Sequence, residues 1–304
     1  MTDQLTPPVP PAPPAPPAPP TGPEDRRGPA PENSPGPTPQ PASQSAKVVA
    51  ILTASLGGVI ALALVGGTVI STIASASVRT ETQVIDATGV NELDVDVSAG
   101  SFRIDFADVD DATLDVTGGW AGGGWTLERE EDELIVSAPD WSFGRAWFFG
   151  GDVRATLTLP RELEDTVLDA QFTVAAGALD ASGRFGDLEV DLGAGEVNVS
   201  GEAREVSADI SAGRARLDLS GVQSADLTVN AGQLDGRFDG PQPRLVEVNV
   251  SAGSLDLALP NGDYDVTSNV SAGQLDNRLD TSASTSNRVA VELSAGQVIL
   301  RSAD

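Results

Sequence analysis

A short motif that recurs at nearly regular intervals constrains this chain more than any other feature. It stands as Val250-Ser251-Ala252-Gly253-Ser254-Leu255-Asp256-Leu257 and returns almost unchanged as Val270-Ser271-Ala272-Gly273-Gln274-Leu275-Asp276. Related copies are centred on Gly100, Gly177, Gly195, Gly213, Gly232 and Gly296. From Gly177 onward, neighbouring glycines are 18, 18, 19, 21, 20 and 23 residues apart. Periods of this size are typical of solenoid proteins.

Each copy carries two short runs of alternating apolar and polar residues. Counted from the glycine, apolar residues fall at minus seven, minus five and minus three, and again at plus two and plus four. In the copy around Gly195 they are Leu188, Val190, Leu192, Val197 and Val199. Alternation with a period of two is typical of half-buried strands. Each repeat is therefore predicted to contain two strands.

The Ala-Gly pair between the two runs predicts a tight corner, because glycine adopts the positive φ that such corners require. One strand pair cannot bury its apolar face alone, whereas stacked repeats share a continuous core. The sequence thus predicts an all-β fold, a β-helix or β-solenoid of about 18–23-residue two-strand repeats. A sandwich or barrel of hairpins is the alternative. The solenoid is favoured because corner and apolar positions stay in phase.

The repeated hydrophobic-Ser-Ala-Gly-x-Leu-Asp units, preceded by Ala155-Thr156-Leu157-Thr158-Leu159-Pro160, resemble the putative-adhesin family of bacterial β-strand-repeat proteins, a domain of unknown function. The resemblance covers roughly residues 86–304, and its motifs are structural. It implies an extracytoplasmic, β-helix-like domain. It brings no catalytic residues and no cofactor.

The N-terminal part of the chain has a different composition. Seventeen of the 22 prolines lie before residue 42, so residues 1–46 cannot form a packed core and are predicted to be a disordered, cytoplasmic tail. The run Pro7 to Pro20 predicts an extended polyproline II segment. It is either a spacer or a docking site for a proline-recognising partner.

An apolar segment follows, with no charged residue from Val48 to Val78. Residues 47–78 are predicted to form one transmembrane helix, since the run is long enough to cross about 30 Å of hydrocarbon. Ala74-Ser75-Ala76 resembles a signal-peptidase site, but the apolar run is longer than a signal core, which favours an uncleaved anchor. Arg26, Arg27 and Lys47 precede the span and only Arg79 follows closely, which places the N-terminus in the cytoplasm.

Beyond the span, residues 79–90 are predicted to be a stalk and residues 91–304 an extracytoplasmic β-solenoid. Strands are expected at 92–97, 102–106, 112–117, 125–130, 133–137 and 153–159, with an exposed hairpin turn between the fourth and the fifth. The glycine- and tryptophan-rich stretch 118–151 departs from the repeat and is predicted to be an insertion.

Composition excludes several functions. The chain has no cysteine and no histidine, which removes thiol chemistry, cysteine-liganded zinc and sites built on a histidine base. Its net charge of −27 argues against nucleic acid as a partner. Paired carboxylates remain for catalysis, yet each acidic residue is explained as the solvated face of a strand. No enzymatic activity is expected.

The position three residues after the glycine offers a candidate metal ladder. Acidic residues recur there as Asp180, Asp235, Asp256 and Asp276, with Asn198 and Arg216 in other copies. Carboxylates aligned by stacking repel unless a cation or arginine intervenes, and calcium suits an oxygen-lined ladder. Surface charge that keeps the protein soluble is the alternative explanation.

The tryptophans offer a candidate binding patch, because all four lie within 28 residues: Trp120, Trp125, Trp141 and Trp147. They are interpreted either as a surface for sugar or protein or as a plug over the N-terminal end of the solenoid. The predicted function is that of a single-pass surface protein, adhesin-like or a scaffold that contacts cell-wall polysaccharide or an envelope protein. An envelope-stress sensor that signals through the helix is the alternative.

Overall fold

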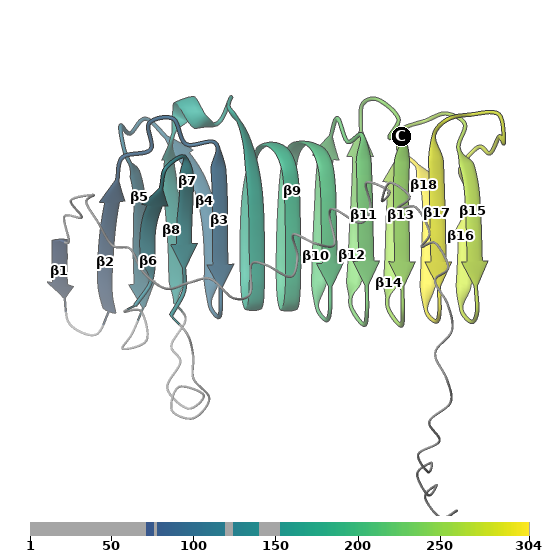
Figure 1. Cartoon of the computed structure of the whole chain (residues 1–304). Coiled ribbons are helices and arrows are strands. Elements are labelled where there is room, and N and C mark those ends of the chain that lie inside the picture. The colour runs from purple at the N-terminus through teal and green to yellow at the C-terminus, as the bar shows by residue number, and fades with distance from the viewer. Residues whose placement is uncertain (1–70, 76–77, 119–123, 140–152, 304) are drawn as a thin grey trace, which may run out of the picture. The chain divides into compact units, whose positions relative to one another are not determined.

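The computed structural model describes residues 71–75, 78–118, 124–139 and 153–303. Within these ranges the fold is all-β, as predicted, with one short 3-10 helix, η1 (Arg161–Leu163), and no α-helix. The strands form one extended, paired array (Figure 1).

The strand before each glycine corner belongs to a first layer. Its members are β3 (Glu92–Val97), β7 (Glu133–Ser137), the first-layer parts of β9 (Val167–Ile210), β11 (Ser224–Val229), β13 (Leu245–Val250), β15 (Asp265–Val270) and β17 (Arg288–Leu293). The pairings along this layer from β7 to β15 are parallel.

The strand after each corner belongs to a second layer. Its members are β4 (Ser101–Ala107), β8 (Arg154–Pro160), the remaining parts of β9, β10 (Arg214–Ser220), β12 (Gln233–Asp239), β14 (Ser254–Leu259), β16 (Gln274–Asn277) and β18 (Gln297–Ser302). Equivalent positions of neighbouring repeats are paired, for example Leu217 with Val199 and Gly236. Such parallel, in-register pairing is expected of stacked repeats and not of hairpins.

The alternating apolar residues of both layers form one core. In the repeat around Gly195, Val190, Leu192, Val197 and Val199 are at most 2% exposed, and the apolar residues at the equivalent positions belong to the same cluster in every other repeat except the one around Gly273. Burying such a side chain contributes about 1.5–3 kcal/mol. The predicted inward positions are therefore confirmed in all repeats but the one around Gly273, where Val270 is 41% exposed.

The N-terminal end of the array is closed by antiparallel strands. Here β5 (Ala112–Gly118) pairs with β8 and with β2 (Val78–Ile85), and β6 (Thr126–Glu130) forms a hairpin with β7. The strands expected between residues 92 and 160 are confirmed to within a residue or two. Antiparallel strands end the parallel stack here because they do not continue its repeat.

The order of the strands changes at the other end. β17 lies between β13 and β15, and β18 lies between β14 and β16. The last repeat of the sequence is therefore inserted inside the stack, and the repeat before it forms the end (Figure 1). The sequence analysis did not anticipate this order.

None of the described residues lies in a helix long and apolar enough to cross a membrane. The described part of the predicted span is extended, because β1 (Ser71–Ser75) pairs antiparallel with β2. The helix prediction is thus wrong for 71–75 and for Val78, where backbone hydrogen bonds go to a neighbouring strand. The rest of the predicted span and the predicted tail 1–46 lie outside the described residues.

Candidate functional site

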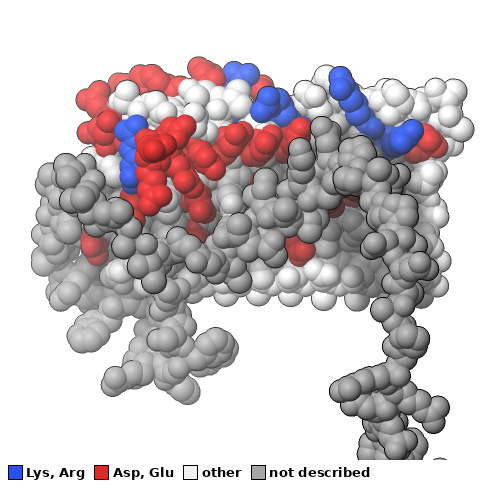
Figure 2. Space-filling view, in the orientation of Figure 1, with Lys and Arg blue, Asp and Glu red and all other residues white. Residues whose placement is uncertain are grey.

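The outward side chains of the first layer form a surface that we call the acidic face. Figure 2 shows acidic side chains gathered over the part of the stack that contains β3 and β9. The acidic face comprises Glu92, Asp94, Asp96, Glu133, Asp169, Asp187, Glu189, Asp191, Glu205, Asp209, Asp226 and Glu247. The first-layer segments of β9 at 167–174, 185–192 and 205–210 contain no lysine or arginine, and neither do β3, β7, β11 and β13. Arg204, next to the segment 205–210, reaches the edge of the face and lies 3.9 Å from Asp187.

Register brings these carboxylates together. Glu92 is aligned with Glu133 on one side and with Asp169 on the other, and Asp226 is aligned with Glu247. Directly opposed residues on neighbouring strands are close enough for like charges to destabilise the pair. The stacking therefore concentrates negative charge that the sequence distributes over more than a hundred residues.

The pKa values on this face reflect that crowding. Burial raises the pKa of Asp94, and the neighbouring Asp96 and Glu92 raise it further. Burial raises the pKa of Glu189 first, and then Asp191 and Asp94 add repulsion. The pKa values of Glu133, Asp191 and Asp226 are raised by the same two causes in the same order. A raised carboxyl pKa means that the folded protein disfavours the charged form.

The outward side chains of the second layer form a different surface, which we call the mixed-charge face. It contains the four candidate metal ligands of the sequence analysis. Arg103 donates to Asp180 at 3.1 Å, and the Asn198 amide donates to the same carboxylate at 3.0 Å. Arg301 donates to Asp256 at 2.8 Å.

The two remaining aspartates of the ladder also have protein partners. Gln233 donates to Asp235 at 3.0 Å, and the Arg278 Nε donates to Asp276 at 3.0 Å. This hydrogen bond, and then the charge of Arg278, lower the pKa of Asp276. No group of three or more potential metal ligands occurs among the described residues. Arginine and amide groups thus occupy the positions from which a cation would bind these aspartates.

Of the four tryptophans, only Trp125 lies within the described residues; Trp120, Trp141 and Trp147 do not. Trp125 is 3% exposed and stacks on Phe102, with 5.8 Å between ring centroids. The buried Gln83 side chain donates to the Trp125 carbonyl oxygen at 2.6 Å and accepts from the Leu127 N–H at 3.0 Å. Trp125 therefore packs in the core at the N-terminal end. No sequence pattern distinguishes Gln83 from a surface glutamine.

The corner glycines stack on one another between the two layers. Six of them have positive φ: Gly100, Gly177, Gly195, Gly213, Gly273 and Gly296. A Cβ on Gly195 would overlap the carbonyl oxygen of Gly177, and a Cβ on Gly232 or Gly253 would overlap the glycine of the neighbouring repeat. A shallow groove runs along this column, with Glu196 and Arg214 beside it. Close backbone approach explains glycine at all eight corners.

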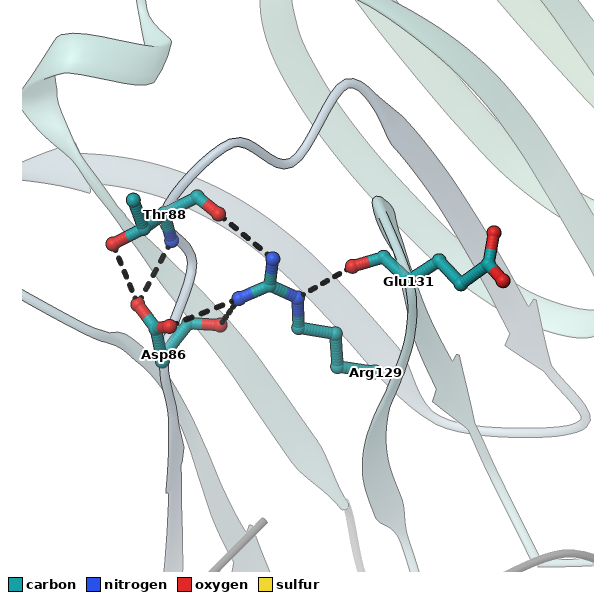
Figure 3. A network of polar contacts seen from close by, with 4 residues as sticks. All are labelled: Asp86, Thr88, Arg129 and Glu131. Atoms are coloured by element: carbon teal, nitrogen blue, oxygen red, sulfur yellow. Dashed lines mark hydrogen bonds and ion pairs between the residues drawn. The ribbon is translucent and has the colours of Figure 1, made fainter. Parts of the chain in front are cut away.

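Arg129, near the end of β6, links three segments of the chain through its guanidinium group. Arg129 donates to the carbonyl oxygens of Glu131, Asp86 and Thr88 at 2.7–2.8 Å and pairs with the Asp86 carboxylate at 3.1 Å (Figure 3). Asp86 also accepts from the Thr88 hydroxyl and N–H. Arg129 thereby fastens the β6–β7 hairpin to the segment after β2. This role could not be predicted from the sequence, because Arg129 and Asp86 are 43 residues apart and meet only in the folded chain.

Comparison with known proteins gives structural matches only. No family model and no curated protein matches this chain. A putative adhesin from Bacteroides fragilis NCTC 9343 matches with a TM-score of 0.47 and 13% identity, over 74% of this chain and 98% of that one.

Two further solved structures illustrate the range of matches. A putative cell adhesion protein from Clostridium sporogenes ATCC 15579 has a TM-score of 0.37 and 11% identity, over 74% and 100% of the two chains. A putative lipid binding protein from Parabacteroides distasonis ATCC 8503 has a TM-score of 0.32 and 14% identity, over 72% and 96%.

Proposed function

We propose that this chain is a non-enzymatic surface protein, adhesin-like, whose stacked repeats form a β-solenoid that displays a binding surface in the cell envelope. The acidic face is the observation that carries this proposal. Register aligns its carboxylates over β7, β3, β9, β11 and β13. Carboxylate groups therefore recur across the surface at the spacing of neighbouring strands, about 4.8 Å. A rigid, periodic surface suits a long or multivalent partner.

The charge of the face indicates what such a partner would carry. Its carboxylates are crowded enough that repulsion raises several pKa values, and a cationic partner would relieve that repulsion. Complementary charge increases association rates and selects partners, and it loses strength as salt screens it. Basic groups on an envelope protein or on a cell-wall polymer are therefore the expected contacts.

Attachment to the membrane is part of the proposal. Residues 48–70 contain no charged side chain and, as a helix, would span about 35 Å, enough to cross a bilayer. This segment ends where β1 begins. With the basic residues Arg26, Arg27 and Lys47 on its N-terminal side, the repeats would lie outside the cell.

Co-sedimentation of the full chain, in detergent, with purified cell-wall sacculi tests the proposal. A variant with Asp94, Asp191 and Asp226 changed to asparagine should lose binding, because it neutralises the centre of the acidic face. The control variant, Asp105→Asn, Glu196→Gln and Asp218→Asn, removes three exposed charges from the mixed-charge face and should bind like the wild type. Equal binding by both variants would contradict a role for the acidic face. No binding by the wild-type chain would favour a sensor that contacts a membrane protein.

A further inference from the structure

The end of the stack consists of a repeat that is out of sequence order. Residues 264–287, which we call the end repeat, contain β15 and β16. β15 pairs only with β17, and β16 pairs only with β18, among the described residues. The chain thus leaves β14, forms the end repeat, and returns to place β17 and β18 underneath it.

The sequence spacing shows that the end repeat is an addition to a continuous series. Gly253 and Gly296 lie on neighbouring repeats in the stack but 43 residues apart in sequence (296 − 253). Removing the 24 residues of the end repeat leaves a spacing of 19 (43 − 24), within the 18–21 residues that separate consecutive glycines from Gly177 to Gly253. The connection from β14 to β17 would then be residues 260–263, comparable to the connections that lead to β11 and β13.

Two of the five inward positions of the end repeat are polar, whereas Val266, Val270 and Leu275 keep the apolar pattern. Ser268 and Asn277 are aligned with Val291 and Leu300 of the repeat below. The two apolar residues are at most 1% exposed, whereas Ser268 and Asn277 are exposed. Terminal repeats of solenoids need a polar outer side to stay soluble, and short edge strands with polar side chains resist pairing with other chains.

The repeat below has the opposite character. The inward residues of β17 and β18 are Val289, Val291, Leu293, Val298 and Leu300, all at most 1% exposed. Without the end repeat, these residues and one edge of both strands would lie open. An apolar core with open strand edges is a template for another chain with the same edges.

We propose that the end repeat is a cap whose function is to keep the β17–β18 end from associating with the same end of a second copy of this chain. Two copies related by a two-fold axis would pair like edges and bury like cores, which is a self-complementary interface. Ser268 and Asn277 oppose this pairing because it would bury their polar groups.

Deletion of residues 264–287 from the full chain tests the cap. We expect the shortened chain to keep its β-sheet circular dichroism and, in sedimentation experiments in detergent, to have at least twice the mass of the full chain at equal concentration. A folded deletion variant in the same oligomeric state as the full chain would overturn the proposal.

A second pair of variants decides the question if the deletion variant does not fold. Ser268→Val with Asn277→Leu restores apolar residues at the inward positions and should raise self-association at least tenfold. Thr267→Val with Gln274→Leu adds apolar residues to the same strands at outward positions and should leave it unchanged. Equal self-association of the two double variants would overturn the proposal.

Discussion

The acidic face and the mixed-charge face cover the same core but differ in charge, because carboxylates crowd together on the first and have arginine or amide partners on the second. On the mixed-charge face, carboxylates alternate with arginine or amide groups, so that Asp180 lies between Arg103 and Asn198. On the acidic face, Glu92 is aligned with Glu133 and Asp169, and Arg204 reaches only the edge of the face, 3.9 Å from Asp187.

The difference arises from which outward residues each layer carries, and the register of both layers aligns those residues into columns. Both layers alternate inward apolar and outward polar residues, and both contribute to one core. Because equivalent positions are aligned, the outward residue of one repeat directly neighbours that of the next. A small compositional bias in each repeat therefore becomes a continuous column. Folding requires only the inward pattern, so the outward columns are free to differ. The repulsion kept on one of them supports the proposal that it is a binding surface.

The largest expected effect comes from breaking the corner that joins the two faces. Gly195→Val should lower the free energy of unfolding by about 3 kcal/mol or more, because it combines a positive φ of 115° with overlap against Gly177. Glu196→Val, at the adjacent exposed position, should change it by less than about 0.5 kcal/mol. Chemical denaturation of both variants measures the difference. Equal stabilities would show that the corner tolerates side chains and that the layers are not held in register there.

A smaller effect is expected from pH, and it should come from the acidic face. Burial and like charge raise the pKa values of Asp94, Glu133, Glu189, Asp191 and Asp226. A raised pKa means that the folded state binds protons more readily than the unfolded state, so stability rises as pH falls from neutral through the raised values. The melting temperature should therefore be higher at about pH 5 than at pH 7.

The same two triple variants test the origin of this pH dependence. Changing Asp94, Asp191 and Asp226 to asparagine should flatten the profile between about pH 7 and pH 5, since it removes three of the groups concerned. The Asp105→Asn, Glu196→Gln and Asp218→Asn control should keep the wild-type slope. At still lower pH, protonation of Asp86 and Asp276, whose pKa values are lowered by hydrogen bonds, should reverse the gain. A profile that falls steadily from pH 7 would contradict the analysis.

Much of the fold could be predicted from the sequence because the repeat constrains it locally. The period of two, the glycine corners and the constant phase predict two strands per repeat and the inward residues, such as Val190 and Val197. The position of the last repeat could not be predicted from spacing alone. Ser268 and Asn277, which replace apolar residues at inward positions, were the available signal, because a repeat with a polar interior is stable only at an end.

The surfaces were harder to predict, because they depend on contacts between distant residues. The column that contains Asp180 and Asp256 was recognised, but Arg103 and Arg301 lie 77 and 45 residues from their partners, and a sequence pattern does not reveal such pairs. The acidic face was overlooked since Asp94, Glu189 and Asp226 each resemble an ordinary solvated position. The stacking register makes them neighbours.

The smallest expected effect gives the sharpest contrast, because one kind of substitution should act in opposite directions on the two faces. Asp191→Asn removes repulsion with Asp209 and should raise the free energy of unfolding by about 0.5 kcal/mol. Asp256→Asn weakens the 2.8 Å pair with Arg301 and should lower it by about 0.5 kcal/mol, since both side chains are partly solvated.

A double-mutant cycle assigns the second effect to its cause. In an Arg301→Ala background, Asp256→Asn should no longer destabilise, because the charge that it pairs with is gone. In the same background, Asp191→Asn should keep its full effect, since Arg301 lies on the other face. Changes of the same sign for both aspartates in the wild-type background would mean that overall net charge, and not the arrangement of each column, determines how the surface affects stability. Opposite signs would show that the two faces are electrostatically independent, so that the acidic face can retain its repulsion for binding while the mixed-charge face stabilises the stack.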